Sequence, residues 1–163
     1  MNKKVDNLKK LLEGIYDPEI PVVNIIEMGI VRNVCFDEAG KLNIEITPTY
    51  SGCPAMKMIE DEIKELAAQH GYTDAVIKKV YAPAWTTDWL SVETKTKLKN
   101  FGISPPGKTI DHDFLTSLKT KVVACPYCNS KNTKLTSEFS STACKSLHFC
   151  NECRQPFEHF KCI

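Results

Sequence analysis

Two pairs of cysteines toward the carboxyl end of the chain have the spacing of metal ligands. Each pair has the form Cys-x-x-Cys, and twenty-one residues separate Cys125 and Cys128 from Cys150 and Cys153. Two thiols on one tight turn can bind the same ion, and this separation allows a hairpin to bring the two turns together. We predict a four-sulfur tetrahedral site with one zinc ion per chain as the favoured occupant. A single iron, an iron–sulfur cluster or a redox dithiol are the alternatives.

The role of this ion is predicted to be structural. The segment after residue 120 is short and holds few large aliphatic side chains, so apolar burial alone cannot fold it. Metal ligation can contribute about 10 kcal/mol or more of folding free energy. Four thiolates also leave no open position for a substrate, which argues against catalysis at this ion.

Other potential ligands lie close to these cysteines in the sequence. Cys144 and Cys162 could form a second, looser metal or cluster site, or they could be ordinary buried cysteines. For His148 and His159 we expect ordinary packing or surface roles rather than ligation.

A third candidate for sulfur chemistry is Cys53, which precedes Pro54 at the start of an expected helix. The positive end of a helix lowers a thiol pKa, so this position is expected to make a thiolate available. Polar turn residues over 47–52, with hydroxyl groups at Thr47 and Thr49, come directly before it. A helix cap or a small buried hydrophobe is the alternative interpretation of this cysteine.

Two carboxylates, Asp17 and Glu19, flank Pro18 on a short turn near the amino end. By themselves they indicate little, because most such groups cap helices or face water.

The elements that position these residues follow from periodicity. Apolar residues at three- and four-residue spacing predict helices over about 4–15 and from Pro54 to Gly71, and a polar segment over 91–101 is expected to form a short helix that ends at Gly102. Alternating apolar residues predict a β-hairpin from 22–36 to 42–46 and a third strand near 75–81. The order α-β-β-α-β-α indicates a compact α+β domain over 1–103, followed by a linker over 104–120 and a zinc-ribbon β domain over 121–163.

Composition restricts the class of protein. Hydrophobic residues make up 42% and charged residues 25%, as in ordinary globular proteins. The apolar runs are too short for a membrane span or a signal-peptide core, so we expect a cytoplasmic protein with reduced cysteines. The net charge of +1 gives no argument for nucleic-acid binding.

Three segments together resemble the metal–sulfur cluster assembly family, which includes SufT-type bacterial proteins and a eukaryotic cytosolic cluster-targeting factor. The segments are 17–21 (DPEIP), 28–31 (MGIV) and 47–54 (TPTYSGCP). The resemblance covers roughly residues 5–103. The tail, with its two cysteine pairs, residues 141–145 (STACK) and residues 156–161 (PFEHFK), is similar to the zinc-ribbon extension of the PaaD family from phenylacetyl-CoA epoxidase operons.

The resemblance implies an accessory protein that assists the assembly or delivery of iron–sulfur or iron cofactors for the phenylacetyl-CoA epoxidase system. Its partners would be the reductase or oxygenase subunits and iron–sulfur assembly proteins. The family's reactive cysteine falls on Cys53, its acidic loop on Asp17 and Glu19, and its hydroxyl groups on Thr47 and Thr49. A cofactor carried in this way would be a transient iron–sulfur cluster or iron.

Our leading hypothesis is therefore a non-enzymatic maturation factor in which the Cys53 loop contacts cluster or client and the ribbon recognises a partner. An enzyme with Cys53 as nucleophile is disfavoured because no histidine lies within fifteen residues of it, although His70 or His112 could approach in space. A structural or adaptor subunit of the oxygenase is the main alternative. A zinc-ribbon nucleic-acid binder that uses ribbon phenylalanines and lysines is a weaker one, and homodimerisation is left open.

Overall fold

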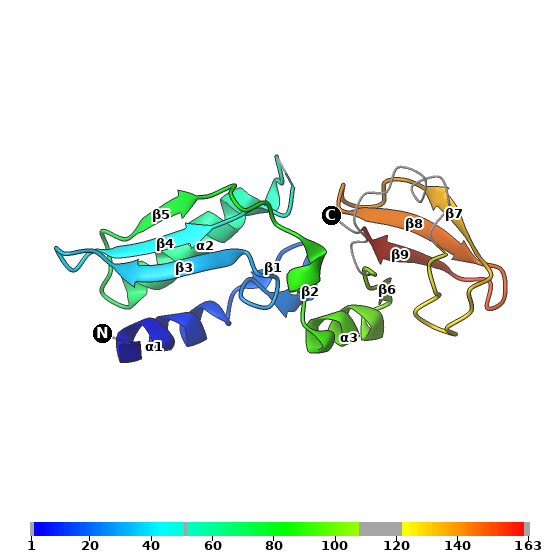
Figure 1. The fold of residues 1–163 in the computed structure, drawn as a ribbon, viewed down its shortest axis with the longest axis horizontal. Coiled ribbons are helices and arrows are strands. Elements are labelled where there is room, and N and C mark those ends of the chain that lie inside the picture. The colour runs from blue at the N-terminus through cyan, green and yellow to red at the C-terminus, as the bar shows by residue number, and fades with distance from the viewer. Residues whose placement is uncertain (1, 51, 108–121, 162–163) are drawn as a thin grey trace. The chain divides into compact units, whose positions relative to one another are not determined.

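The structure is a computed structural model that describes residues 2–50, 52–107 and 122–161 (Figure 1). The chain divides into two compact units, Met1–Trp85 and Thr86–Ile163.

The first unit begins with helix α1 (Asn2–Leu12), which is amphipathic. Its inner positions Leu8 and Leu12 are buried, as is Ile15 just after the helix. Strands β1 (Tyr16–Asp17) and β2 (Ile20–Asn24) then form a small antiparallel hairpin. The predicted strand over 22–36 is therefore interrupted after β2, because the Asn24 side chain accepts hydrogen bonds from the backbone N–H groups of Ile26 and Glu27 and turns the chain.

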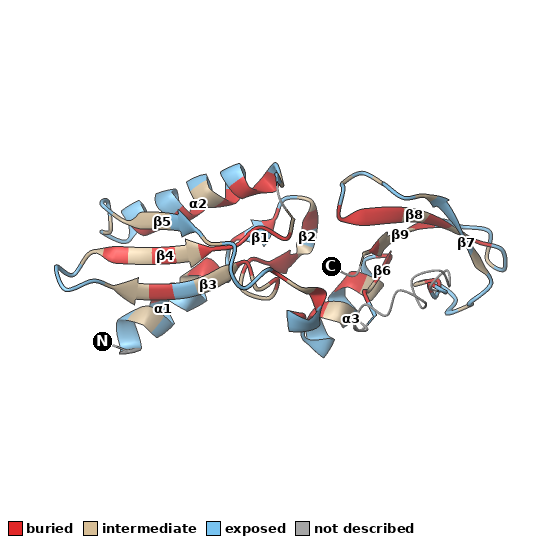
Figure 2. Cartoon of the chain, turned by 45° about the horizontal axis from the view of Figure 1, so that its top comes forward, coloured by how far each residue is buried: buried red, intermediate tan, exposed pale blue. Residues whose placement is uncertain are grey.

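A three-stranded sheet forms the centre of this unit, in the order β3-β4-β5. Strands β3 (Val31–Phe36) and β4 (Leu42–Ile46) are antiparallel, as predicted, and β5 (Val76–Lys79) pairs in parallel with β4. A parallel pair needs a crossover, and helix α2 (Ala55–Gln69) supplies it. Buried and half-buried residues alternate along β4, so one face of this strand lies on the core (Figure 2).

Helix α2 covers that core with a stripe of apolar side chains. Its fully or nearly buried residues recur at three- and four-residue spacing and are Ala55, Met56, Ile59, Ile63 and Ala67. The helix ends before Gly71, whose φ of 87° is a conformation that glycine adopts without steric cost. The crossover thus places the start of α2, where Cys53 lies, at the end of β4.

The second unit contains a short 3-10 helix η1 (Thr87–Trp89), helix α3 (Val92–Asn100) and a four-stranded sheet. The sheet strands are β6 (Ile103–Ser104), β7 (Thr133–Ser137), β8 (Lys145–Cys150) and β9 (Pro156–Phe160), in the order β6-β9-β8-β7. Strands β7, β8 and β9 are antiparallel neighbours, whereas β6 runs parallel to β9.

The α+β class with a ribbon-like β region is confirmed. Helix α3 was expected to close the first domain, but the structure groups it with the ribbon, because β6 directly after it is hydrogen-bonded to β9. The boundary at residue 103 stays a prediction, as does the linker over 104–120, most of which lies outside the described residues.

None of the helices in the described part of the chain is both long enough and apolar enough to cross a membrane.

Candidate metal centre and cysteine loop

The structure brings the sulfur atoms of the two cysteine pairs together. The Sγ atoms of Cys125, Cys128, Cys150 and Cys153 all lie within 4.8 Å of one another. Two of these separations are 3.6 Å, between Cys125 and Cys153, and 3.5 Å, between Cys128 and Cys150. Zn–S bonds of about 2.3 Å in a tetrahedron give S–S edges of about 3.8 Å. The donor set and its spacing therefore fit a four-coordinate thiophilic metal.

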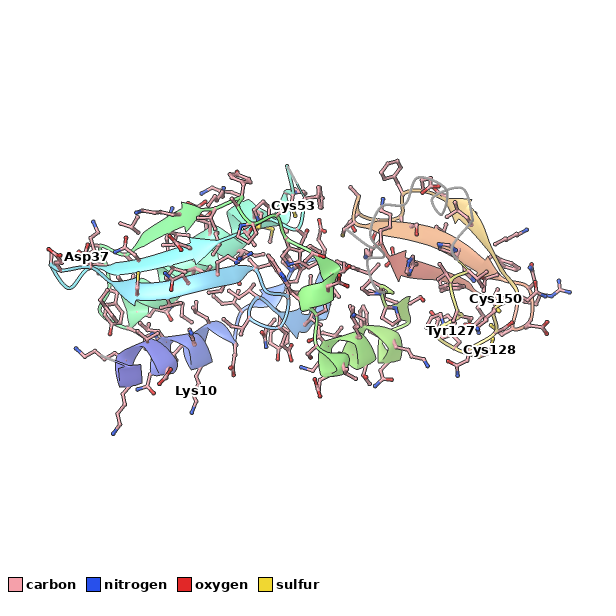
Figure 3. The ribbon with its side chains drawn as sticks, in the orientation of Figure 1. Lys10, Asp37, Cys53, Tyr127, Cys128 and Cys150 are labelled. Carbon is pink, nitrogen blue, oxygen red and sulfur yellow. The ribbon has the colours of Figure 1, made fainter. Side chains whose placement is uncertain are left out.

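The two cysteine turns have the same backbone hydrogen bonds. The N–H of Cys125 donates to Ser130 O, and the N–H of Asn129 donates to Cys125 O. In the second turn, Cys150 N–H donates to Gln155 O and Arg154 N–H donates to Cys150 O. Two turns of the same geometry, with their sulfur atoms within 4.8 Å of one another, therefore face each other as one site (Figure 3 labels Cys128 and Cys150).

Each turn also places a residue with a side chain in the left-handed region. Asn129 has a φ of 61° and Arg154 a φ of 62°, four residues after the first cysteine of each pair. Asparagine tolerates this conformation well, whereas arginine does not favour it. The backbone hydrogen bonds of the second turn hold Arg154 in this less favoured conformation.

Cys53, the candidate reactive thiol, is half-buried on the connection between β4 and α2 (Figure 3). Its N–H donates to Tyr50 O at 3.3 Å, and Gly52 before it has a φ of 83°. Helix α2 begins at Ala55, with Pro54 as the N-cap. The predicted position of Cys53 at a helix start is therefore what the structure shows.

The predicted effect of that position on its acidity is wrong. Burial raises the pKa of the Cys53 thiol, and the negative charges of Glu19 and Asp17 raise it further. Hydrogen bonds from the Ala55 backbone and the Tyr50 side chain lower the pKa but do not compensate. Any lowering of the pKa by the start of the helix is thus outweighed by burial of the thiol and by the two carboxylates. The free thiol is predominantly protonated at neutral pH.

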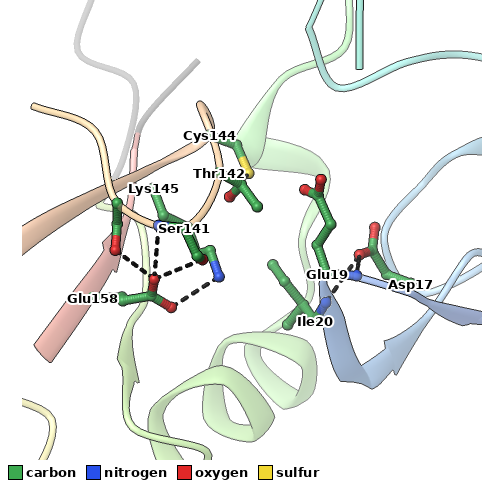
Figure 4. Close-up of polar contacts among 9 residues, drawn as sticks. Asp17, Glu19, Ile20, Ser141, Thr142, Cys144, Lys145 and Glu158 are labelled. Carbon is green, nitrogen blue, oxygen red and sulfur yellow. Dashed lines mark hydrogen bonds and ion pairs between the residues drawn. The ribbon is translucent and has the colours of Figure 1, made fainter. Parts of the chain in front are cut away.

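The two carboxylates lie on the tight turn between β1 and β2. One carboxylate oxygen of Asp17, whose side chain is buried, accepts hydrogen bonds from the N–H groups of Glu19 at 2.8 Å and Ile20 at 3.0 Å (Figure 4). These bonds fix the turn that carries the half-buried Glu19. The structure therefore brings Asp17 and Glu19 within electrostatic range of Cys53, as their influence on its pKa shows.

The remaining predicted residues lie in both units. Thr47 and Thr49 are buried in the segment between β4 and Cys53, and Thr47 N–H donates to Ile30 O at 2.8 Å. Cys144 is buried in the second unit, with its sulfur 3.1 Å from Thr142 Oγ1. Cys162 lies outside the described residues, so the suggested second site of Cys144 and Cys162 stays a prediction.

Sequence reasoning missed part of the surroundings of Cys53. A shallow pocket at the thiol is lined by Pro48, Gly52, Cys53, Met56, Lys79 and Tyr81. The last two follow from the parallel pairing of β5 with β4, which carries the end of β5 toward the end of β4. Parallel pairing of strands so far apart in the sequence leaves no local signal, so the position of Lys79 and Tyr81 beside Cys53 could not be predicted.

Comparisons with known sequences match two parts of the chain. Residues 6–83 match the profile described as an iron–sulfur cluster assembly protein, and residues 110–161 match that of the PaaD zinc beta ribbon domain. An Escherichia coli (strain K12) protein, provisionally named as a subunit of 1,2-phenylacetyl-CoA epoxidase, is 44% identical over 160 residues. The alignment covers 98% of this chain and 94% of that protein.

Other relatives match the first part only. Bacillus subtilis (strain 168) YitW, named an Fe-S protein maturation auxiliary factor, is 37% identical over 94 residues, which are 57% of this chain and 91% of that protein. Staphylococcus aureus (strain USA300) SufT, also named an Fe-S protein maturation auxiliary factor, is 32% identical over 85 residues, which are 52% of this chain and 96% of that protein. A crystal structure of the domain of unknown function DUF59 from Bacillus anthracis superposes with a TM-score of 0.54 at 27% identity. It covers 60% of this chain and 92% of that one.

Proposed function

We propose that this chain, which belongs to the PaaD family, is an accessory maturation factor that assists iron–sulfur or iron cofactor assembly or delivery for the phenylacetyl-CoA epoxidase system. Two facts support the proposal. Relatives of the first unit are named iron–sulfur maturation factors, and the relative that spans both units is named for the epoxidase.

The observation that carries the proposal is the combination of one half-buried thiol with two nearby carboxylates. Without a cation, Cys53 is kept as a thiol by burial and by Glu19 and Asp17. An arriving ferrous ion or cluster iron is attracted by the same carboxylates and replaces the thiol proton, which leaves to water while an Fe–S bond forms. The site therefore favours a protected neutral thiol when empty and a thiolate ligand when iron is present.

A single sulfur ligand suits transfer better than storage. In the described part of the first unit, Cys35 is the other cysteine, and it lies on strand β3 within the sheet rather than on the Cys53 loop. A cluster held here would keep ligand positions for thiolates of a donor or client, and the half exposure of Cys53 leaves room for their approach. Ligand exchange can then pass iron on without any redox step by this chain.

The ribbon is proposed to hold one zinc ion through Cys125, Cys128, Cys150 and Cys153. Bound there, zinc supplies folding free energy rather than chemistry, because four thiolates complete its coordination. The ribbon would then serve as a partner-recognition module.

The test is anaerobic reconstitution of the full chain with ferrous iron and sulfide, followed by metal and sulfide analysis and transfer to the apo epoxidase reductase or oxygenase. We expect one tightly held zinc plus substoichiometric iron that is lost in Cys53→Ala. Cys35→Ala is the matched control, since it removes a half-buried thiol from the same unit. Equal iron binding and cofactor transfer by wild type and Cys53→Ala would overturn the proposal.

A second candidate is a non-catalytic adaptor subunit of the oxygenase. The name of the Escherichia coli relative, which calls it a subunit, favours it. Stable copurification with the oxygenase, together with an unchanged oxygenase iron content in cells that lack this chain, would support this candidate over the first.

The two weaker hypotheses lose support from the structure. For a nucleic-acid binder, Phe157, Phe160 and Lys145 are buried and cannot stack on bases or contact phosphates, which leaves only exposed residues such as Phe139, Lys134 and Arg154 of the suggested surface. For a cysteine enzyme, the His70 ring is bonded to Leu66 O on its own helix, and His112 lies outside the described residues. No catalytic step is proposed for Cys53.

A further inference from the structure

Helix α3 and strand β6 touch both sides of the first cysteine turn, although both profile matches leave residues 84–109 out. We name the segment Val92–Ser104 the clamp. Before the turn, Ser104 Oγ donates to Ala124 O at 2.9 Å, one residue ahead of Cys125. After it, Lys99 Nζ donates to Asn129 Oδ1 at 2.6 Å, one residue beyond Cys128.

The clamp also contacts the middle of the turn. Gly102 has a φ of 93°, and a Cβ at this position would lie 2.8 Å from the Tyr127 hydroxyl oxygen. The Tyr127 ring, which stands between the two cysteines of the turn, therefore packs directly against the backbone of the clamp. Glycine serves two needs here, since it permits both the positive φ and the close approach of the ring.

The far end of the clamp is fixed to the ribbon sheet. Ile103 pairs with Glu158 and Ser104 with His159 in the parallel β6–β9 ladder. The His159 ring adds a hydrogen bond from Nδ1–H to Ser104 O at 3.0 Å. Leu98 and Ile103, which are almost fully buried, anchor the clamp by apolar packing.

We propose that the clamp supports the metal centre by fixing the Cys125–Cys128 turn in the conformation that binds the metal. Metal binding and docking of Val92–Ser104 on the ribbon are then thermodynamically coupled. Ser104, Lys99 and Gly102 are positioning residues, because they act on the ligand turn and not on the metal. The proposal concerns the ribbon alone and does not depend on iron handling at Cys53.

Metal binding and clamp docking are thermodynamically linked. If the metal favours the docked clamp, the docked clamp must favour the bound metal by the same free energy. Outer partners that orient ligands typically change metal affinity by about 10- to 100-fold when they are removed. The clamp should therefore slow metal release, and removal of the metal should release the clamp from the sheet.

The first experiment measures zinc release from the full chain to a chromogenic chelator. We expect Ser104→Ala to release zinc about tenfold faster, because Ala124 O loses its donor. Lys99→Ala should release it about twofold faster, because its hydrogen bond is exposed. Lys95→Ala on the same helix is the matched control and should release zinc at the wild-type rate.

A double-mutant cycle separates positioning from a general loss of stability. Asn129→Gly removes the acceptor of Lys99 while keeping the positive φ, and combined with Lys99→Ala it should add no further acceleration. Release at the wild-type rate by both Ser104→Ala and Lys99→Ala would overturn the proposal.

The second experiment follows hydrogen exchange of the clamp as zinc is removed from the wild-type chain. Amides of residues 98–104 should lose protection at the same zinc occupancy as those of β8 and β9. Protection of these amides that persists after β8 and β9 have become unprotected would overturn the proposal independently of any variant.

Discussion

Cys53 illustrates how neighbours, rather than position on a helix, decide the chemistry of a residue. Its pKa is raised by burial, then by Glu19 and Asp17, so less thiolate is present at a given pH than in an exposed cysteine. Glu19→Gln removes one of the two charges and should lower the pKa of Cys53. Alkylation of Cys53 at pH 8, followed by peptide mass spectrometry, should therefore be faster in Glu19→Gln than in wild type.

The matched control for this prediction is Glu13→Gln, an exposed charge of the same unit. It should leave the alkylation rate unchanged. A Glu19→Gln rate at or below the wild-type rate would show that Glu19 does not act on the thiol.

A second residue-scale prediction concerns Glu158 on β9. Burial opposes its ionisation, but hydrogen bonds from Lys145, Ser140 and Ser141 outweigh burial and lower its pKa to about 2 (Figure 4). Because the folded pKa lies below the ordinary value of 4.5, Glu158 contributes stability above about pH 4.5, which is lost as the pH falls toward 2. The free-energy difference between wild type and Glu158→Gln should therefore be constant above about pH 5 and shrink below it.

The size of the free-energy difference between wild type and Glu158→Gln depends on Lys145, the ion-pair partner of Glu158. The Lys145 side chain is only 4% exposed, and Glu158→Gln removes the carboxylate that pairs with its ammonium group at 2.8 Å. We expect a loss of about 2 to 4 kcal/mol at pH 7 in zinc-saturated urea unfolding. Lys145→Met combined with Glu158→Gln should recover part of it. A difference that does not change with pH would contradict the assigned pKa.

At the scale of elements, the loop that leads into α2 depends on one backbone conformation. Gly52 has a φ of 83° with nothing within 4 Å of its ideal Cβ position, so Gly52→Ala introduces strain without a clash. The strain should cost about 1 to 2 kcal/mol or shift the loop. We expect weaker iron binding at Cys53 in anaerobic titrations.

Gly40 provides a closely matched control for Gly52. It has a φ of 80°, also with nothing within 4 Å, but it lies in the turn between β3 and β4. Gly40→Ala should therefore cost similar stability in urea unfolding and leave iron binding intact. Equal loss of iron binding in both variants would show that stability, and not loop geometry, is responsible.

Periodicity predicted the elements whose determinants are local. The stripe of α2, the alternation of β4 and the glycines that follow α2 and α3 are encoded within a few residues of where they act. The β1–β2 hairpin was missed because the Asp17 side chain makes its turn and the Asn24 side chain then turns the chain again after β2, within a run that is rich in valine and isoleucine. The pairing of β6 with β9 was missed because it joins residues that lie far apart in the sequence, such as Ile103 and Glu158.

The candidate sites show the same division between local and distant information. The cluster of four cysteine sulfurs could be predicted because two Cys-x-x-Cys turns carry their own geometry. The direction in which the Cys53 pKa shifts could not be predicted. It depends on burial, which only the fold creates, and on Asp17 and Glu19, which lie far earlier in the sequence.

At the scale of the whole molecule, the two units differ in what stabilises them. The first unit has an extended core of aliphatic side chains on α1, α2 and the sheet. In the second unit, one buried cluster consists of Val123, Cys125, Cys150 and Phe157, with Cys153 packed against it. Two of the buried members, Cys125 and Cys150, belong to the proposed zinc site, so loss of zinc would weaken this core and remove its cross-link together.

This difference predicts stepwise unfolding. Zinc removal by a chelator should unfold Thr86–Ile163 and leave Met1–Trp85 folded. Limited proteolysis of the chelated protein should then yield a resistant fragment that ends near residue 85, whereas the zinc-loaded protein should resist cleavage between 86 and 104. A chelated protein that is cut first near residue 104 would place the boundary where the sequence suggested it. Loss of all structure in one transition would show instead that the ribbon metal stabilises both units.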